Sequence, residues 1–281
     1  MACPFLKEGR ARYCHAAPVK KLILDGPGAT EVGRCASPEY LQCDLVSQNA
    51  PHQSRCPHLE DIRVQYCGVS PVTKLVPFSD SELSSCTGNG FRYCDSYLSI
   101  ARPHATTPGA QLLFSSNHFW LDAEDSGQCH IGLDGFLADV AGSVEGVTFA
   151  TLYGSHCPAL SITVHGIEWP MSFPNPLVIQ KVNSRVRSDP ARLTSDPYGS
   201  GWLFEGFELP GRTRAGLVSG PQAAAWQAEE HQRLTNEIHD RHAPGCDGGS
   251  PVRGVAGLLS RQHMVCLFQH FFSQRGWTVE E

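Results

Sequence analysis

The chain lacks several features that mark common functional classes. No apolar run approaches the ~18 residues of a membrane-spanning helix, and the start carries no secretory signal pattern. Basic residues are scattered through a chain of net charge −6, so no cationic surface for nucleic acid is expected. Gly-rich nucleotide loops, a Gly-x-Ser-x-Gly elbow and a recognisable catalytic triad are also missing. We therefore expect a cytoplasmic protein without independent catalytic activity.

The twelve cysteines include no Cys-x-x-Cys pair, yet eight of them form a repeated pattern. The first copy contains Cys3, Cys14, Cys35 and Cys43, and the second contains Cys56, Cys67, Cys86 and Cys94. Their steps are 11, 21 and 8 residues in the first copy and 11, 19 and 8 in the second. Such self-similarity indicates a duplicated unit. In the cytoplasm thiols stay reduced, which favours metal ligation over disulfides.

Four thiols in each copy are enough for one metal centre. Thiolates complete a tetrahedral Zn²⁺ site or hold a [4Fe–4S] cluster. The missing Cys-x-x-Cys pair favours two clusters, because a cluster tolerates ligands from scattered pieces of backbone. Two structural Zn²⁺ ions are the alternative, since a unit of about 40 residues buries too little apolar surface to be stable alone.

The composition changes along the chain and indicates three regions. A duplicated, metal- or cluster-stabilised domain is predicted over residues 1–104, with units 1–50 and 54–104. A Pro-, Gly- and Thr-rich linker follows at 102–109. Short strands, among them 147–152, 159–164 and 177–182, and one helix at 136–141 fill residues 110–208, and helices are predicted over 214–281. The expected fold class is α+β, mainly β.

The middle region contains segments with a specific resemblance. They are His118-Phe-Trp-Leu-Asp122, Ile131 to Gly142, Leu177-Val-Ile-Gln-Lys-Val-Asn183 and Ser195-Asp-Pro-Tyr-Gly-Ser-Gly-Trp-Leu203. Together they resemble the glycine cleavage system H protein over roughly residues 112–207. The resemblance implies a β-sandwich of lipoyl-carrier type.

The lipoyl attachment site is the main departure from that family. The family carries its lipoyl arm on a lysine at a hairpin tip, and His165 stands at the matching position here. An imidazole cannot form the amide bond that lipoylation makes on an amine, and the next lysine is Lys181 in a later strand. We therefore expect no lipoate, and we interpret His165 as an exposed turn residue.

The last predicted helix, about 258–273, carries a continuous apolar stripe that must be covered. We expect a partner protein to cover it, and packing against the predicted helix at 221–241 is the alternative. The sequence thus predicts an accessory electron-transfer subunit with two iron–sulfur clusters and a docking domain for a redox enzyme complex. A non-redox assembly protein with two zinc sites is the alternative function.

Overall fold

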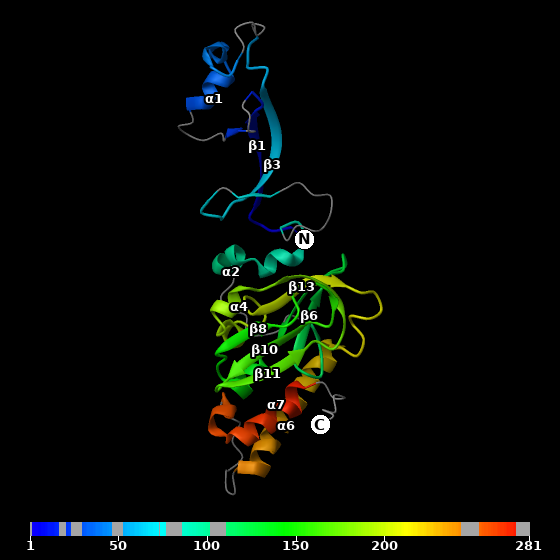
Figure 1. The fold of residues 1–281 in the computed structure, drawn as a ribbon. Helices are drawn as coiled ribbons and strands as arrows, with labels where there is room; N and C mark the ends of the chain where they lie inside the picture. Colours follow the sequence, from blue (N-terminus) through cyan, green and yellow to red (C-terminus); the bar gives the residue numbers. More distant parts are fainter. Residues whose placement is uncertain are drawn as a thin grey trace. The chain divides into compact units, whose positions relative to one another are not determined.

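The computed structural model describes residues 2–16, 21–23, 30–46, 53–72, 74–76, 86–101, 111–242 and 253–273. The chain divides into two compact units, Met1–Gly88 and Asn89–Glu281 (Figure 1). This boundary falls inside the second cysteine copy, whereas the predicted linker at 102–109 lies outside the described residues. Residues 89–101 therefore belong with the second unit and not with the four-cysteine domain predicted over 1–104.

The first unit is built on two long antiparallel strands. Its elements are β1 (Leu6–Cys14), β2 (Lys21–Ile23), α1 (Thr30–Cys35), η1 (Pro38–Gln42), β3 (Leu59–Cys67) and β4 (Leu75–Val76). The strand order is β2-β1-β3-β4, and β1 pairs with β3 along its whole length. Ion pairs connect the central strands, with 2.9 Å between Arg12 Nε and Asp61 Oδ1. Charged residues on both strands interrupt the alternation of apolar and polar residues from which a strand is predicted.

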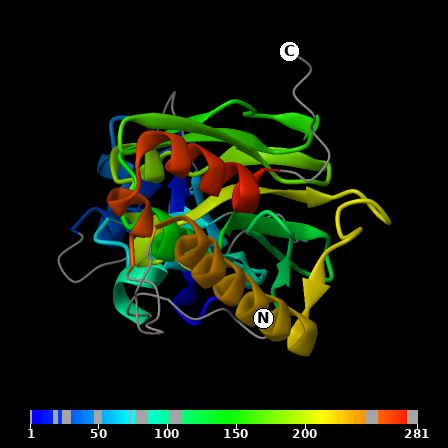
Figure 2. The ribbon, with the colours of Figure 1, turned by 90° about the horizontal axis from the view of Figure 1, so that it is seen from below.

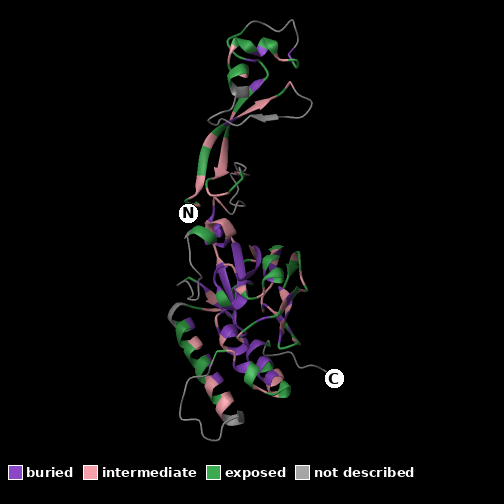
Figure 3. Cartoon of the chain, turned by 90° about the vertical axis from the view of Figure 1, so that its left-hand side faces the viewer, coloured by how far each residue is buried: buried purple, intermediate pink, exposed green. Residues whose placement is uncertain are grey.

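The first unit has a small described core. Tyr40, Val46, Cys56 and Leu59 form its buried cluster. Figure 3 shows few buried residues in this unit and many in the second one. Small units bury a low fraction of their surface, which agrees with the small cluster among the described residues of this unit.

The second unit contains two antiparallel sheets. Its strands are β5 (Leu113–Phe114), β6 (Phe119–Ala123), β7 (Gln128–Leu133), β8 (Gly146–Phe149), β9 (Gly154–His156), β10 (Ala159–Val164), β11 (Ile167–Ser172), β12 (Leu177–Val182), β13 (Trp202–Glu208) and β14 (Val218–Ser219). One sheet has the order β11-β10-β8, and the other β14-β5-β6-β7-β13-β12-β9. Side chains of both sheets, such as Ile131 and Ile162, share one buried cluster. This layered arrangement agrees with the expected mainly β class.

Helices complete the second unit. They are η2 (Asn89–Tyr93), α2 (Asp95–Ala101), α3 (Phe136–Ala141), α4 (Arg185–Ser188), α5 (Arg192–Ser195), α6 (Gly220–His242), η3 (Val255–Leu258) and α7 (Arg261–Phe272). The predicted helix at 136–141 is confirmed as α3, and the predicted helix at 221–241 is confirmed as α6.

The C-terminal helices are part of the second unit and do not form the separate extension predicted over 214–281. Both lie on the side of that unit that faces the viewer in Figure 2. The apolar stripe of α7 is buried in the main core, and Phe268 stacks on Trp169 of β11 with 4.1 Å between ring centroids. The expectation that a partner covers this stripe is therefore wrong. The helix also starts later than predicted, because Ser260 caps it by accepting a hydrogen bond from His263 N.

Candidate functional site

One end of the first unit gathers four of the predicted ligands. Cys14 ends β1, Cys35 ends α1, Cys43 follows η1, and Cys56 precedes β3. Cys56 is buried in the cluster around Tyr40, and the other three cysteines pack against that cluster half-buried. The group therefore combines three ligands predicted for the first copy with one predicted for the second.

Three more predicted ligands lie toward the other end of the β1–β3 pair. Cys67 ends β3 opposite Leu6, the first residue of β1. Cys3 donates its backbone N–H to the carbonyl of Cys86, with 2.8 Å between the two atoms. Cys94 follows η2 in the second unit, where its N–H bonds to the carbonyl of Phe91.

The eight cysteines have the chemistry of soft-metal ligands. All are free thiols, which can be deprotonated to bind a soft or borderline cation. In the described parts of the chain, no group of three or more His, Cys, Asp or Glu side chains is arranged to hold a metal ion. Their role as ligands therefore stays a prediction.

His165 lies at the tip of the β10–β11 hairpin. Val164 pairs with Ile167, so His165 and Gly166 form a two-residue turn, with φ angles of 49° and 68°. Such a turn requires left-handed conformations, which glycine adopts freely and histidine only at a cost. The imidazole is exposed on one side and lies against η3, since a Cβ placed on Gly257 would come within 3.1 Å of His165 Nε2.

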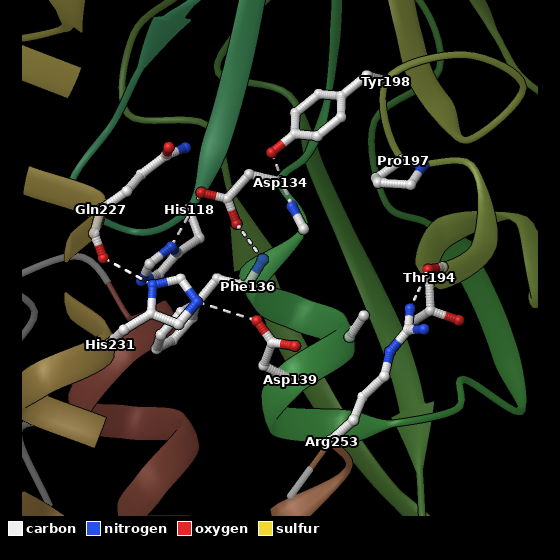
Figure 4. Close-up of a pocket in the computed structure, with 12 residues that line it drawn as sticks. His118, Asp134, Phe136, Asp139, Thr194, Pro197, Tyr198, Gln227, His231 and Arg253 are labelled. Carbon is white, nitrogen blue, oxygen red and sulfur yellow. Dashed lines mark hydrogen bonds and ion pairs between the residues drawn. The ribbon is translucent and has the colours of Figure 1, made fainter. Parts of the chain in front are cut away.

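The second unit holds a hollow of about 350 Å³ beside α3 (Figure 4). Its lining includes His118, which is fully buried and stacks on Phe136 with 4.0 Å between ring centroids. His118 Nδ1 lies 3.0 Å from Asp134 Oδ2, and Nε2 lies 3.7 Å from Glu230 Oε2. Burial opposes a charge on this imidazole, but the two carboxylates outweigh it and raise the pKa of His118.

A second charged pair lies at the rim of the hollow. His231 Nε2 is 3.0 Å from Asp139 Oδ2, while Nδ1 is 2.7 Å from the carbonyl oxygen of Gln227. Two acceptors around one ring favour the imidazolium, and the hydrogen bond to Asp139 is the main cause of the raised pKa of His231. Arg253 donates to the carbonyl oxygen of Thr194 at 2.6 Å.

The acidic side chains and the histidines that line the hollow are paired with one another. Both ring nitrogens of His231 are engaged, and His118 is shielded from solvent. Sequence reasoning missed this site because its residues come from distant segments. The available indication was the resemblance to the H protein, because His118 and Asp134 lie in the segments that carry it. No pattern in the sequence around Arg253 indicates a site.

Comparisons with known proteins support an H-protein-like domain. No family model matches the chain. Over 97 residues, 34% of this chain and 76% of the relative, it is 26% identical to glycine cleavage system H protein 1 of Pseudomonas putida. Over 98 residues, 34% of this chain and 78% of the relative, it is 28% identical to the glycine cleavage system H protein of Psychrobacter cryohalolentis.

A solved structure is also similar. The match to the glycine cleavage system H protein from Mycobacterium marinum covers 44% of this chain and 98% of that protein's chain, with a TM-score of 0.37 and 18% identity.

None of the helices in the described ranges combines the length and apolarity needed to cross a membrane.

Proposed function

We propose that this chain is an accessory protein whose first unit holds two thiolate-ligated centres and whose H-protein-like domain is a docking scaffold. The observation that carries this proposal is the gathering of four cysteines around Tyr40, in a unit whose described core is otherwise small. A structural metal supplies free energy of folding that such a small core cannot. Each centre would then stabilise one end of the β1–β3 pair.

The distance between the two cysteine groups favours a structural role for the centres. Strand β1 has nine residues from Leu6 to Cys14, which span roughly 27 Å at about 3.4 Å per residue. Electron transfer falls steeply with distance, so a direct relay between centres at the two ends would be slow. The function that the geometry supports best is therefore a non-redox assembly protein with two structural zinc sites.

Electron transfer through two iron–sulfur clusters is the second candidate. It is favoured by the origin of the cysteines, which come from a strand end, a helix end and two loop positions rather than from Cys-x-x-Cys turns. A [4Fe–4S] cluster is larger than a single ion and can collect ligands from such separate pieces. Each cluster would then exchange electrons with a redox enzyme complex and not with the other cluster.

Metal analysis of anaerobically purified protein tests both candidates. Two zinc ions per chain in a colourless sample would support the assembly protein. Iron and sulfide with broad absorbance near roughly 400 nm would support the clusters. Protein that retains and binds neither metal would overturn the proposed centres altogether.

The docking role also requires that the H-protein-like domain carries no lipoyl arm. Intact and peptide mass spectrometry, after co-expression with a lipoylation system, should show no adduct on the wild-type chain. The matched control is His165→Lys, which places an amine at the same turn and shows whether the lipoylation enzyme recognises the domain. A lipoylated wild-type peptide from residues 159–181 would contradict the alignment of His165 with the carrier lysine.

A further inference from the structure

Strand pairing in the first unit brings together cysteines from different copies of the repeat. Strands β1 and β3 pair antiparallel from Leu6 opposite Cys67 to Cys14 opposite Leu59. Antiparallel pairing places the start of one strand beside the end of the other. Cys56, which precedes β3, therefore arrives beside the end of β1, and Cys3, which precedes β1, arrives beside the end of β3.

Backbone hydrogen bonds connect cysteines of different copies at both ends of the β1–β3 pair. The N–H of Cys56 donates to the carbonyl of Cys35 at 2.9 Å, and the N–H of Cys3 donates to the carbonyl of Cys86 at 2.8 Å. These two bonds occupy positions that the sequence repeat makes equivalent. In each hydrogen bond, the first cysteine of one copy donates to the third cysteine of the other copy, and not to the third cysteine of its own copy.

The side chains at the Cys14 end agree with the backbone. Cys56 is only 4% exposed within the cluster around Tyr40, and Cys14, Cys35 and Cys43 pack against that cluster. Cys3 lies beyond the far end of β1, a strand that spans roughly 27 Å. Zinc–sulfur bonds measure about 2.3 Å, so one ion cannot bridge Cys3 and Cys14 while β1 keeps its extended form.

We propose that the two copies exchange their first cysteine. Cys14, Cys35, Cys43 and Cys56, which pack at one cluster, would supply the four thiolates of one site for a zinc ion or a cluster, and Cys3 would belong with Cys67 and Cys86 at the other end. In the described residues these thiols do not surround an ion, so binding must draw their side chains together. This inference rests on the proposed metal-binding function and replaces the grouping by copy that the sequence suggests. The role of Cys94 as a ligand remains a prediction from the sequence. Each site then joins both central strands, so the metal stabilises their pairing as well as one loop.

Metal stoichiometry of full-length double variants separates the two groupings. The probe is Zn²⁺, added anaerobically to metal-free protein and measured by elemental analysis after gel filtration, with Co²⁺ absorption as an independent report of thiolate ligation. Wild type should bind two equivalents. The variant Cys14→Ser/Cys56→Ser removes two ligands of one site and should keep one equivalent. The matched variant Cys14→Ser/Cys3→Ser damages both sites and should keep none.

The opposite result would overturn the exchange while leaving the proposed function intact: none retained by Cys14→Ser/Cys56→Ser and one retained by Cys14→Ser/Cys3→Ser. A wild-type chain that binds neither zinc nor a reconstituted cluster would instead refute the proposed function itself. Should the variants fail to fold, thiol alkylation of wild type at increasing zinc occupancy, followed by peptide mapping, replaces them. Protection of Cys56 together with Cys14, Cys35 and Cys43 supports the exchange, and protection of Cys3 together with Cys14 but not of Cys56 contradicts it.

Discussion

The two units of this chain are stabilised in different ways. In the second unit, one buried cluster runs through both sheets and includes the apolar face of α7. In the first unit, the largest described apolar cluster is the small one around Tyr40, and its long strands are joined by ion pairs such as Arg63–Glu8, whose side chains are largely exposed. Exposed ion pairs contribute about 0–1 kcal/mol each. From this comparison we propose that the first unit depends on its cysteines in a way that the second unit does not.

The largest effect on the apolar unit is expected from its C-terminal helix. Replacing Phe268 with Ala removes the stacking on Trp169 and leaves a cavity, which should lower the free energy of unfolding by about 3–5 kcal/mol. The control is Leu258→Ala, because Leu258 is 76% exposed and its loss should matter by less than about 0.5 kcal/mol. Equal denaturation midpoints for the two variants would mean that α7 is not part of this core.

A smaller effect is expected at Glu205, a buried carboxylate of the second unit. Burial opposes its charge, but His130 and Lys181 outweigh burial and lower the pKa of Glu205 to about 2. A lowered pKa stabilises the fold above the unfolded pKa of about 4.3, and this contribution is lost as pH falls toward 2. The variant Glu205→Gln should be less stable near neutral pH by roughly 1–3 kcal/mol, with a flatter loss of stability in acid.

Urea unfolding between pH 2 and pH 7 measures this difference, and Glu168→Gln on the exposed face of β11 is the control. A variant Glu205→Gln with the acid dependence of wild type would show that Glu205 does not carry the pH-dependent stability.

The smallest effect is expected at the rim of the hollow. Asp139 holds the pKa of His231 above its ordinary value of about 6.5. The resulting stabilisation is complete below that value and disappears as pH rises through the folded-state pKa. Because both side chains are partly exposed, Asp139→Asn should cost only about 0.2–1 kcal/mol. An NMR titration of His231 should show a lower midpoint in Asp139→Asn, and an unchanged midpoint would contradict the pairing.

Much of the second unit could be predicted from its sequence. Strands β10 and β12 agree with the predicted ranges 159–164 and 177–182, since apolar side chains with high strand propensity fill them. Strand β11 was missed because it contains Pro170, which disfavours a central strand. The structure places β11 at a sheet edge, where a missing N–H is tolerated.

The candidate sites were harder to predict because they depend on long-range pairing. Spacing alone grouped the cysteines by copy, whereas the β1–β3 register brings Cys56 to the end of β1 beside Cys14. Likewise, the hollow combines His118, from a turn before β6, with Arg253, which precedes η3. No local pattern connects residues so far apart in the chain. The exposed position of His165 was predicted correctly, because its two-residue turn depends only on neighbouring residues.

The dependence of the first unit on metal is tested most directly by chelation of the full chain. Hydrogen exchange measured by mass spectrometry, before and after removal of metal under reducing conditions, follows both units in one experiment. We predict that amides of β1 and β3 lose protection by at least a factor of ten when metal is removed, while those of β6, β7 and β13 are unchanged. Equal protection of β1 and β3 with and without metal would contradict the central claim that thiolate-bound centres stabilise the first unit.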